Sequence, residues 1–141
     1  MTFSILLVDD SMPMRSVIKK AFKAAGYGTS DFHEAANGKE ALDQLQGNWI
    51  DIVVTDFTMP VMNGLELIEK MKENDLYRDI PVVVVTTEGS RERVDQFMKS
   101  GARGYIKKPF TPEQIRDLIT EILGESDGYE SFDCGDDDFD F

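Results

Sequence analysis

Cysteine, basic residues and long apolar runs are all scarce in this sequence, and each scarcity excludes a class of protein. The single cysteine, Cys134, has no partner within the chain, so no internal disulfide is expected. No apolar run approaches the ~20 residues that a membrane-spanning helix needs, so we expect no membrane insertion. The first residues have no basic segment and reach Asp9 and Asp10 early, which is unlike a secretory signal. We therefore expect a protein of the reducing cytoplasm.

Basic residues number 15 against 27 acidic ones, which gives a net charge of −12. A protein that binds nucleic acid by itself needs basic groups that meet phosphates, so no nucleic acid partner is expected. Eight of the acids lie in residues 125–141, which contain no lysine or arginine, and residues 1–124 keep 19 acids against 15 bases. The length of 141 residues fits one domain. We expect that domain over residues 1–124 and a disordered tail over 125–141.

The tail 125–141 contains aromatic as well as acidic residues, namely Tyr129, Phe132, Phe139 and Phe141. It is either a solvated, solubilising extension or a segment that binds a surface, because acidic-aromatic segments commonly fold in a partner's groove. In the second case the surface belongs either to the domain itself or to a basic partner protein.

Short apolar runs alternate along the chain with stretches that have helical spacing. The purest run, 80–86, includes four consecutive valines, and Thr111-Pro112-Glu113-Gln114 is a typical helix start. Runs of β-branched residues between helices predict parallel strands covered on both faces, and hence an α/β fold with a doubly wound sheet. The predicted strands lie near 3–8, 29–34, 51–55, 80–86 and 103–107. The predicted helices lie near 14–25, closed by Gly26, at 39–46, 65–73 and 90–100, and from 112 to Gly124.

Polar side chains follow or end four of the five predicted strands. Asp9 and Asp10 follow the first strand, Asp56 follows the third, Thr86 ends the fourth, and Lys108 follows the fifth. Ligands of open parallel sheets bind beyond the carboxyl ends of the strands, so we expect these groups to converge there. Three carboxylates at one point repel one another unless a cation holds them, and Mg²⁺ prefers such oxygen ligands. A lysine and a hydroxyl beside them are typical ligands for a phosphoryl group.

These residues stand in motifs that resemble the receiver domains of two-component signalling, and most of all the single-domain chemotaxis regulators of CheY type. The resemblance covers about residues 3–123 and implies a response regulator with a flavodoxin-like (βα)5 fold and strand order 2-1-3-4-5. The motifs are Asp9-Asp10, Asp56-Phe57-Thr58-Met59-Pro60, Val85-Thr86-Thr87-Glu88 and Gly104-Tyr105-Ile106-Lys107-Lys108-Pro109-Phe110.

The resemblance implies a phosphorylation switch. Asp56 would be the phosphoacceptor that takes a phosphoryl group from the phosphohistidine of a histidine kinase, forming an acyl phosphate. Asp10 and Asp56 would ligate Mg²⁺ together with the backbone carbonyl of Thr58, and Asp9 would act directly or through water. Beyond catalysing its own phosphorylation and dephosphorylation, such a protein is no enzyme.

The resemblance also assigns the remaining polar groups. Lys108 would neutralise the phosphoryl oxygens, and Thr86 would donate its hydroxyl to them. Lys108 is chosen over Lys107 because it directly precedes Pro109. Tyr105 would turn inward as Thr86 moves and so act as the switch tyrosine. The implied output face comprises Ser90, Arg91, Val94 and Tyr105.

The implied partners are a histidine kinase, a flagellar motor switch protein or another target, and a phosphatase, with the regulator itself a monomer. The alternative is a phosphorelay intermediate or a phosphate sink in another two-component pathway. An Asp-nucleophile phosphatase of the haloacid dehalogenase type is less favoured, because Asp56-Phe57-Thr58 lacks that family's second acid. Thr58 and Thr87 stand where the best-known chemotaxis members carry Asn and Ala. Residues at these positions gate the attacking water and so affect the lifetime of the phosphorylated form.

Overall fold

The computed structural model describes residues 3–57, 61–86, 91–108 and 110–123. The predicted tail 125–141 lies outside these residues, as do Thr58, Thr87, Ser90 and Pro109. The strands are β1 (Ser4–Val8), β2 (Asp31–Ala35), β3 (Ile52–Asp56), β4 (Val82–Thr86) and β5 (Gly104–Lys107). The helices are α1 (Met12–Phe22) with a π-helical turn (Lys23–Tyr27), α2 (Gly38–Gly47), α3 (Gly64–Lys72), α4 (Arg91–Lys99) and α5 (Pro112–Leu123).

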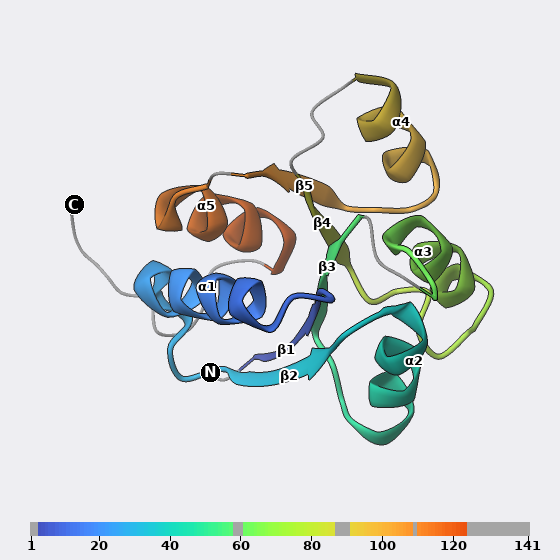
Figure 1. Cartoon of the computed structure of the whole chain (residues 1–141), viewed down its shortest axis with the longest axis horizontal. Coiled ribbons are helices and arrows are strands. Elements are labelled where there is room, and N and C mark those ends of the chain that lie inside the picture. Colours follow the sequence, from blue (N-terminus) through green and yellow to red (C-terminus); the bar gives the residue numbers. More distant parts are fainter. Residues whose placement is uncertain (1–2, 58–60, 87–90, 109, 124–141) are drawn as a thin grey trace.

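The five strands form one parallel sheet in the order β2-β1-β3-β4-β5 (Figure 1). This arrangement confirms the predicted fold class: strands and helices alternate along the chain, and the strand order is the 2-1-3-4-5 order that the resemblance implied. The register brings the strand ends to one level: Val8 pairs with Thr55, Asp56 with Val85, and Thr86 with Lys107. The residues that follow β1, β3, β4 and β5 therefore start from the same edge of the sheet.

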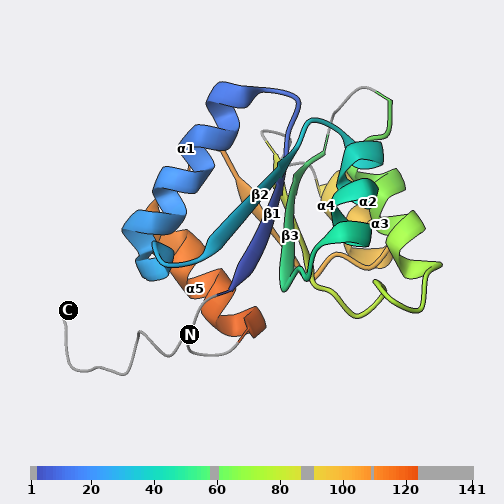
Figure 2. The same ribbon diagram turned by 90° about the horizontal axis from the view of Figure 1, so that it is seen from below.

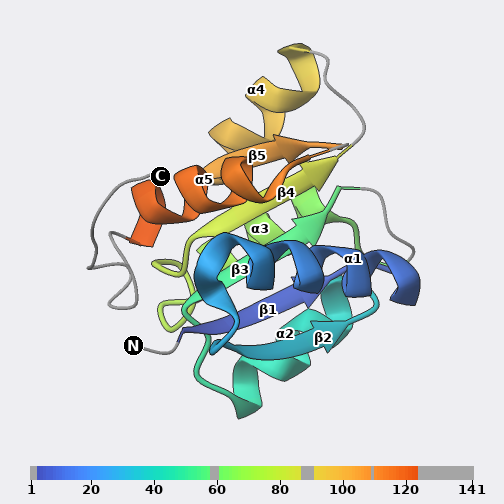
Figure 3. The ribbon, with the colours of Figure 1, turned by 90° about the vertical axis from the view of Figure 1, so that its left-hand side faces the viewer.

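Helices cover both faces of the sheet. Helices α1 and α5 lie on one face and α2, α3 and α4 on the other (Figures 2 and 3). Strand β4, which lies between β3 and β5, is fully buried along its length, whereas the edge strand β5 alternates between buried and exposed residues. A continuous run of four valines suits a strand with apolar cover on both sides, as the sequence predicts. Within the described residues, no helix combines the length and apolar character needed to cross a membrane.

Helix starts follow the capping signals in the sequence. The Gln114 N–H donates to Thr111 Oγ1 at 3.2 Å, and the Thr111 N–H donates to Gln114 Oε1 at 2.9 Å. The same reciprocal pair forms at α3 between Asn63 and Glu66, at 2.9 and 3.1 Å. Each pair satisfies two N–H groups that a helix end otherwise leaves without partners. These caps fix where α3 and α5 begin, beyond the carboxyl ends of β3 and β5.

Helix α1 is followed by a turn that is wider than the helical spacing of its apolar residues predicts. Helix α1 ends at Phe22, and the following turn is π-helical with Gly26 at a φ of 107°, which is the left-handed region that favours glycine. This wide turn places Tyr27 in the core, where its hydroxyl lies 3.3 Å from Thr120 Oγ1 of α5. The second strand begins at Asp31, two residues later than predicted, where the Asp31 N–H donates to Phe3 O at 2.9 Å.

One residue of the segment that leads from β3 into α3 adopts a backbone conformation that its side chain disfavours. Val61 has a φ of 69° and is 74% exposed. A β-branched side chain in the left-handed region collides with its own backbone, while asparagine tolerates that region. The cost of this conformation is not offset by burial of the Val61 side chain.

We predict that Val61→Asn stabilises the protein. The free energy of unfolding should rise by about 1 kcal/mol, which corresponds to a melting temperature higher by roughly 4 °C in thermal melts. The matched control is Leu76→Asn, because Leu76 is 79% exposed and is not among the residues with positive φ. Equal effects of the two substitutions would show that Val61 carries no backbone strain.

Candidate functional site

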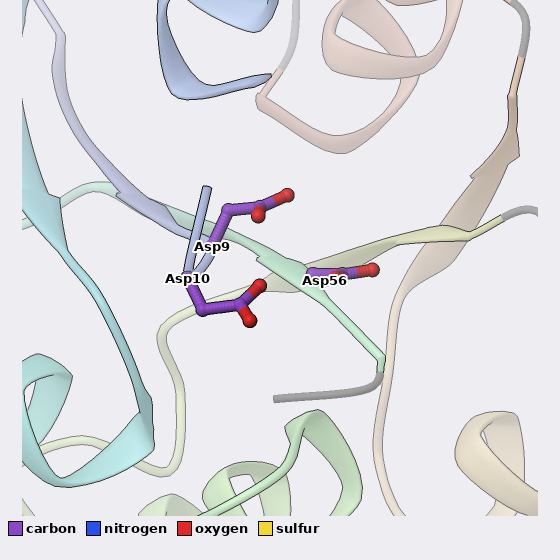
Figure 4. A group of neighbouring side chains, drawn as sticks. All are labelled: Asp9, Asp10 and Asp56. Carbon is purple, nitrogen blue, oxygen red and sulfur yellow. The ribbon is translucent and has the colours of Figure 1, made fainter. Parts of the chain in front are cut away.

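Three carboxylates converge at the carboxyl edge of the sheet. Asp9 and Asp10 directly follow β1, and Asp56 is the last residue of the neighbouring strand β3. One carboxylate oxygen from each lies within 4.8 Å of the others, and Figure 4 shows the three side chains around a common point. The burial differs: Asp9 is buried, Asp56 is partly buried and Asp10 is exposed. The structure thus brings together the three acids that the sequence singled out.

Asp9 is held in place from several directions. Only 2% of the residue is exposed, its N–H donates to Ala35 O at 3.0 Å, and its Oδ1 accepts the Ser11 N–H at 2.9 Å. Among the described residues, Asp9 Oδ2 is the one buried side-chain nitrogen or oxygen atom that has no hydrogen-bond partner. A buried carboxylate oxygen without a partner is costly, because it has lost its hydration. This atom therefore marks a place where a cation would be stabilised.

Lys108 provides a positive charge beside these acids. Its Nζ lies 3.7 Å from Asp56 Oδ1 and 3.8 Å from Asp9 Oδ2, at ion-pair rather than hydrogen-bond distance. The Lys108 N–H donates to Thr86 O at 2.8 Å, which ties the end of β5 to the end of β4. Lys107 is exposed on β5. Of the two adjacent lysines, Lys108 is thus the one that reaches the acids.

The other predicted residues lie on β4, β5 and α4. Thr86 is buried at the end of β4. Tyr105 is 43% exposed on β5, and its ring centroid lies 6.0 Å from that of Phe97 in α4. Arg91 is exposed and Val94 partly buried on the same helix. The predicted Thr58 carbonyl and Ser90 lie outside the described residues.

Burial and mutual repulsion make two of the acids, Asp9 and Asp56, resist ionisation. Burial raises the pKa of the Asp9 carboxyl above its ordinary value, against the lowering effects of the Ser11 N–H and Lys108. Burial also raises the pKa of Asp56, with Lys108 opposing and the negative charge of Asp9 adding to the rise. In both cases loss of hydration outweighs the attraction of one lysine. The site is therefore short of positive charge.

A close approach of the backbone fixes Asp56. The Gly64 N–H donates to Phe57 O at 2.9 Å, which draws the first turn of α3 onto the end of β3. A Cβ on Gly64 would lie 2.6 Å from the carbonyl oxygen of Asp56, closer than such atoms approach one another. Glycine at this position thus permits the contact between α3 and the strand end that carries Asp56.

The sequence analysis did not identify two charged residues beside the site, Arg15 and Glu34. Arg15, on α1, is buried, and its Nε donates to Glu34 Oε1 on β2 at 2.7 Å. The Arg15 Nη1 group also donates to the backbone carbonyl of Asp9. The available signal was a charged residue inside the apolar stripe that runs through Met14 and Ile18. A charge on a core-facing stripe normally has a buried partner.

The donor set fits a magnesium ion. Carboxylate oxygens are the ligands that Mg²⁺ prefers, and it commonly takes one or two of them while keeping several waters. The unpartnered oxygen of Asp9, the partly buried Asp56 and the exposed Asp10 provide oxygens of this kind with one side open to solvent. The described groups that could hold the ion are thus Asp9, Asp10 and Asp56.

Comparisons with known proteins agree with this arrangement. A family model described as the response regulator receiver domain matches residues 5–120. The chain is 41% identical to the chemotaxis protein CheY homolog of Campylobacter jejuni over 125 residues, which cover 88% of this chain and 95% of that protein. Among solved structures it is similar to Vibrio cholerae chemotaxis protein CheY4, with a TM-score of 0.78, 32% identity, and coverage of 87% of this chain and 100% of that one.

A third similarity concerns a complex. CheY in the CheX–CheY–BeF3–Mg²⁺ complex of Borrelia burgdorferi matches with a TM-score of 0.77 and 27% identity, over 86% of this chain and 89% of that chain. The chain is therefore similar along most of its length to chemotaxis regulators from several bacteria.

We predict that Asp56→Asn stabilises the metal-free protein. The substitution removes one of three converging charges and keeps an oxygen that can accept the Phe57 N–H, which now donates to Asp56 Oδ1 at 2.9 Å. Thermal melts in EDTA at pH 7 should show a gain on the order of 1 kcal/mol in the free energy of unfolding. The matched control is Asp117→Asn on α5, whose carboxylate is exposed and is not one of the three converging acids, and it should have little effect.

The pH dependence of this gain has a definite sign. Because burial raises the pKa of Asp56 in the folded state, the folded protein binds this proton more tightly than the unfolded chain. The unaltered protein therefore gains stability relative to Asp56→Asn as the pH falls from 7 toward the ordinary value of 3.8. The advantage of the variant should shrink over that range. An advantage that is absent at pH 7, or that grows on acidification, would contradict charge crowding at this site.

Proposed function

The chain belongs to the response regulator receiver domain family, and on that basis we propose that it is a signalling switch phosphorylated on Asp56. The observation that carries this proposal is the meeting of Asp56 with two further acids and Lys108 at one edge of the sheet. A carboxylate is a competent phosphoryl acceptor when neighbouring groups orient it and offset its charge.

We assign the metal to the three acids. Asp10 and Asp56 would bind Mg²⁺ together with the Thr58 carbonyl, and Asp9 would bind directly or through water. The ion, when bound, offsets the repulsion between the acceptor carboxylate and the incoming phosphoryl group. The magnesium in the similar Borrelia burgdorferi complex supports this assignment.

The transfer requires the acceptor to be ionised and oriented. A carboxylate oxygen of Asp56 attacks the phosphorus of a phosphohistidine, a P–O bond forms, and the P–N bond to the imidazole of the histidine kinase breaks. The Phe57 N–H holds Asp56 Oδ1 at 2.9 Å, so the carboxylate is oriented before the donor arrives. Lys108 would approach the transferred phosphoryl oxygens, since it already lies 3.7 Å from Asp56. The product is an acyl phosphate on Asp56.

The output of the switch is protein binding. Thr86 ends β4 at the same edge as Asp56 and would donate its hydroxyl to the phosphoryl group. Tyr105 on the adjacent strand would then turn from its exposed position toward the space near Thr86 and change the face formed with Arg91 and Val94. The relatives named as chemotaxis proteins favour a flagellar motor switch protein as the target. A histidine kinase of the same pathway would be the donor.

We predict that the unaltered chain is labelled by radioactive acetyl phosphate in the presence of Mg²⁺. Asp56→Asn should lose essentially all label, because an amide cannot form the acyl phosphate. The label should be stable in acid and released by base or hydroxylamine, as measured by gel autoradiography after each treatment. EDTA should suppress it.

The matched control for acceptor identity is Asp117→Asn, which makes the same chemical change on an exposed carboxylate of α5 and should keep full labelling. Label that persists in Asp56→Asn would refute the assignment of the acceptor.

A further inference from the structure

Arg15 connects the first turns of α1 to the backbone of the acid pair. Its Nη1 group donates to the carbonyl oxygen of Asp9, and its Nε donates to Glu34 Oε1 at 2.7 Å. Helical side chains lean toward the amino end of their helix, which is why a residue one turn inside α1 reaches back past the Ser11 cap. A single guanidinium thus joins α1, β2 and the residue that follows β1.

The carbonyl that Arg15 binds belongs to the peptide group that joins Asp9 to Asp10. A peptide group is planar, so a hydrogen bond on its oxygen fixes the direction in which the chain continues to the next residue. The Asp9 N–H is held by Ala35 O, and the Ser11 N–H is held by Asp9 Oδ1. Asp10 is exposed, so the position of its carboxylate depends on how firmly this backbone is held.

Glu34 keeps the guanidinium in place. It accepts from Arg15 through Oε1 and from Lys19 Nζ through Oε2 at 2.9 Å, and these two bonds, with Arg15 first, hold the pKa of its carboxyl below the usual range. Glu34 therefore stays charged and offsets the charge of Arg15. Because Glu34 offsets the positive charge of Arg15, Arg15 acts on the acids mainly by fixing the position of their backbone.

We propose that Arg15 is a positioning residue for the metal site, which sets the Asp9–Asp10 backbone so that both carboxylates face the same point as Asp56. The proposal rests on the proposed magnesium site. Groups that orient metal ligands from behind commonly account for 10- to 100-fold in metal affinity. Arg15 touches no metal itself and acts through the peptide carbonyl.

The test compares Mg²⁺ affinity among matched variants of the full chain by isothermal titration calorimetry. Trp49 lies ahead of β3, at the opposite edge of the sheet, so tryptophan fluorescence is unsuited to this purpose. Arg15→Met keeps the length and apolar stem of the side chain and removes both hydrogen bonds. We expect its Kd for Mg²⁺ to rise about 10-fold or more. Glu34→Gln leaves Arg15 in the chain but removes the charge that holds its guanidinium in place. This variant should give a smaller rise in Kd.

The control is Lys19→Met, because Lys19 binds the same Glu34 but does not reach Asp9. We expect its Kd to stay within about two-fold of the unaltered value. A second readout needs no metal: in ¹H–¹⁵N NMR spectra of the metal-free protein, the Asp10 amide should shift and broaden in Arg15→Met and remain unchanged in Lys19→Met.

The outcomes separate the role in positioning from a role in stability. If Arg15→Met melts at a lower temperature but binds Mg²⁺ as tightly as Lys19→Met does, Arg15 only stabilises the fold and the proposal is overturned. If Arg15→Met does not fold, the Kd of Glu34→Gln decides, and a value equal to that of Lys19→Met overturns the proposal. If the unaltered chain binds no Mg²⁺, the proposed metal site itself fails, and the role of Arg15 fails with it.

Discussion

The excess of negative charge at the carboxyl edge of the sheet is the constraint on which the rest of this structure depends. Three carboxylates meet there, and Lys108 is the cation that the described residues place at ion-pair distance from them. Asp9 cannot move away from this repulsion, because it is buried and its backbone N–H, its backbone carbonyl and its Oδ1 are all hydrogen-bonded. Energy from elsewhere in the fold must therefore hold the acids together.

That energy comes from the apolar layers behind the site. The four valines of β4 are buried to 1% exposure or less, and each such side chain contributes roughly 1.5–3 kcal/mol when fully buried. Two apolar clusters, one on each face of the sheet, fix the strands whose ends carry the acids. A well-packed domain can keep an unfavourable group of charges in place for a ligand that neutralises it. The order of the strands then determines which charges meet.

Much of this arrangement could be predicted from the sequence, because it follows from chain order and strand ends. The carboxyl ends of parallel strands lie at one edge of a sheet, so the alternation of strands and helices places Asp9, Asp56 and Lys108 at that edge. The strand order that the resemblance implies then brings the ends of β1, β3 and β5 close together. The chemical roles assigned to the site residues stay predictions, and Thr58 and Ser90 lie outside the described residues. Arg15 was missed because its partners are the carbonyl of Asp9 and a carboxylate of β2, the least regular strand in sequence. A backbone acceptor leaves no trace in sequence pattern.

The π-helical turn and the strained Val61 were also beyond the reach of periodicity. The turn exists because Tyr27 packs under α5, which is a contact between residues far apart in the chain. Local spacing gives the face of a helix but says nothing about such distant contacts, and it carries no information on the sign of φ at a non-glycine residue.

Helix α4 has one fully buried residue, Phe97, whose ring centroid lies 5.9 Å from that of Phe57 and 6.0 Å from that of Tyr105. A helix that fully buries only one side chain is expected to open locally at a lower free energy than the one that unfolds the sheet. Its amide hydrogens will therefore exchange with solvent well before those of β1, β3 and β4. The ring that anchors α4 also contacts the neighbour of Asp56. A weakly held helix is thus in direct contact with the residue that follows Asp56.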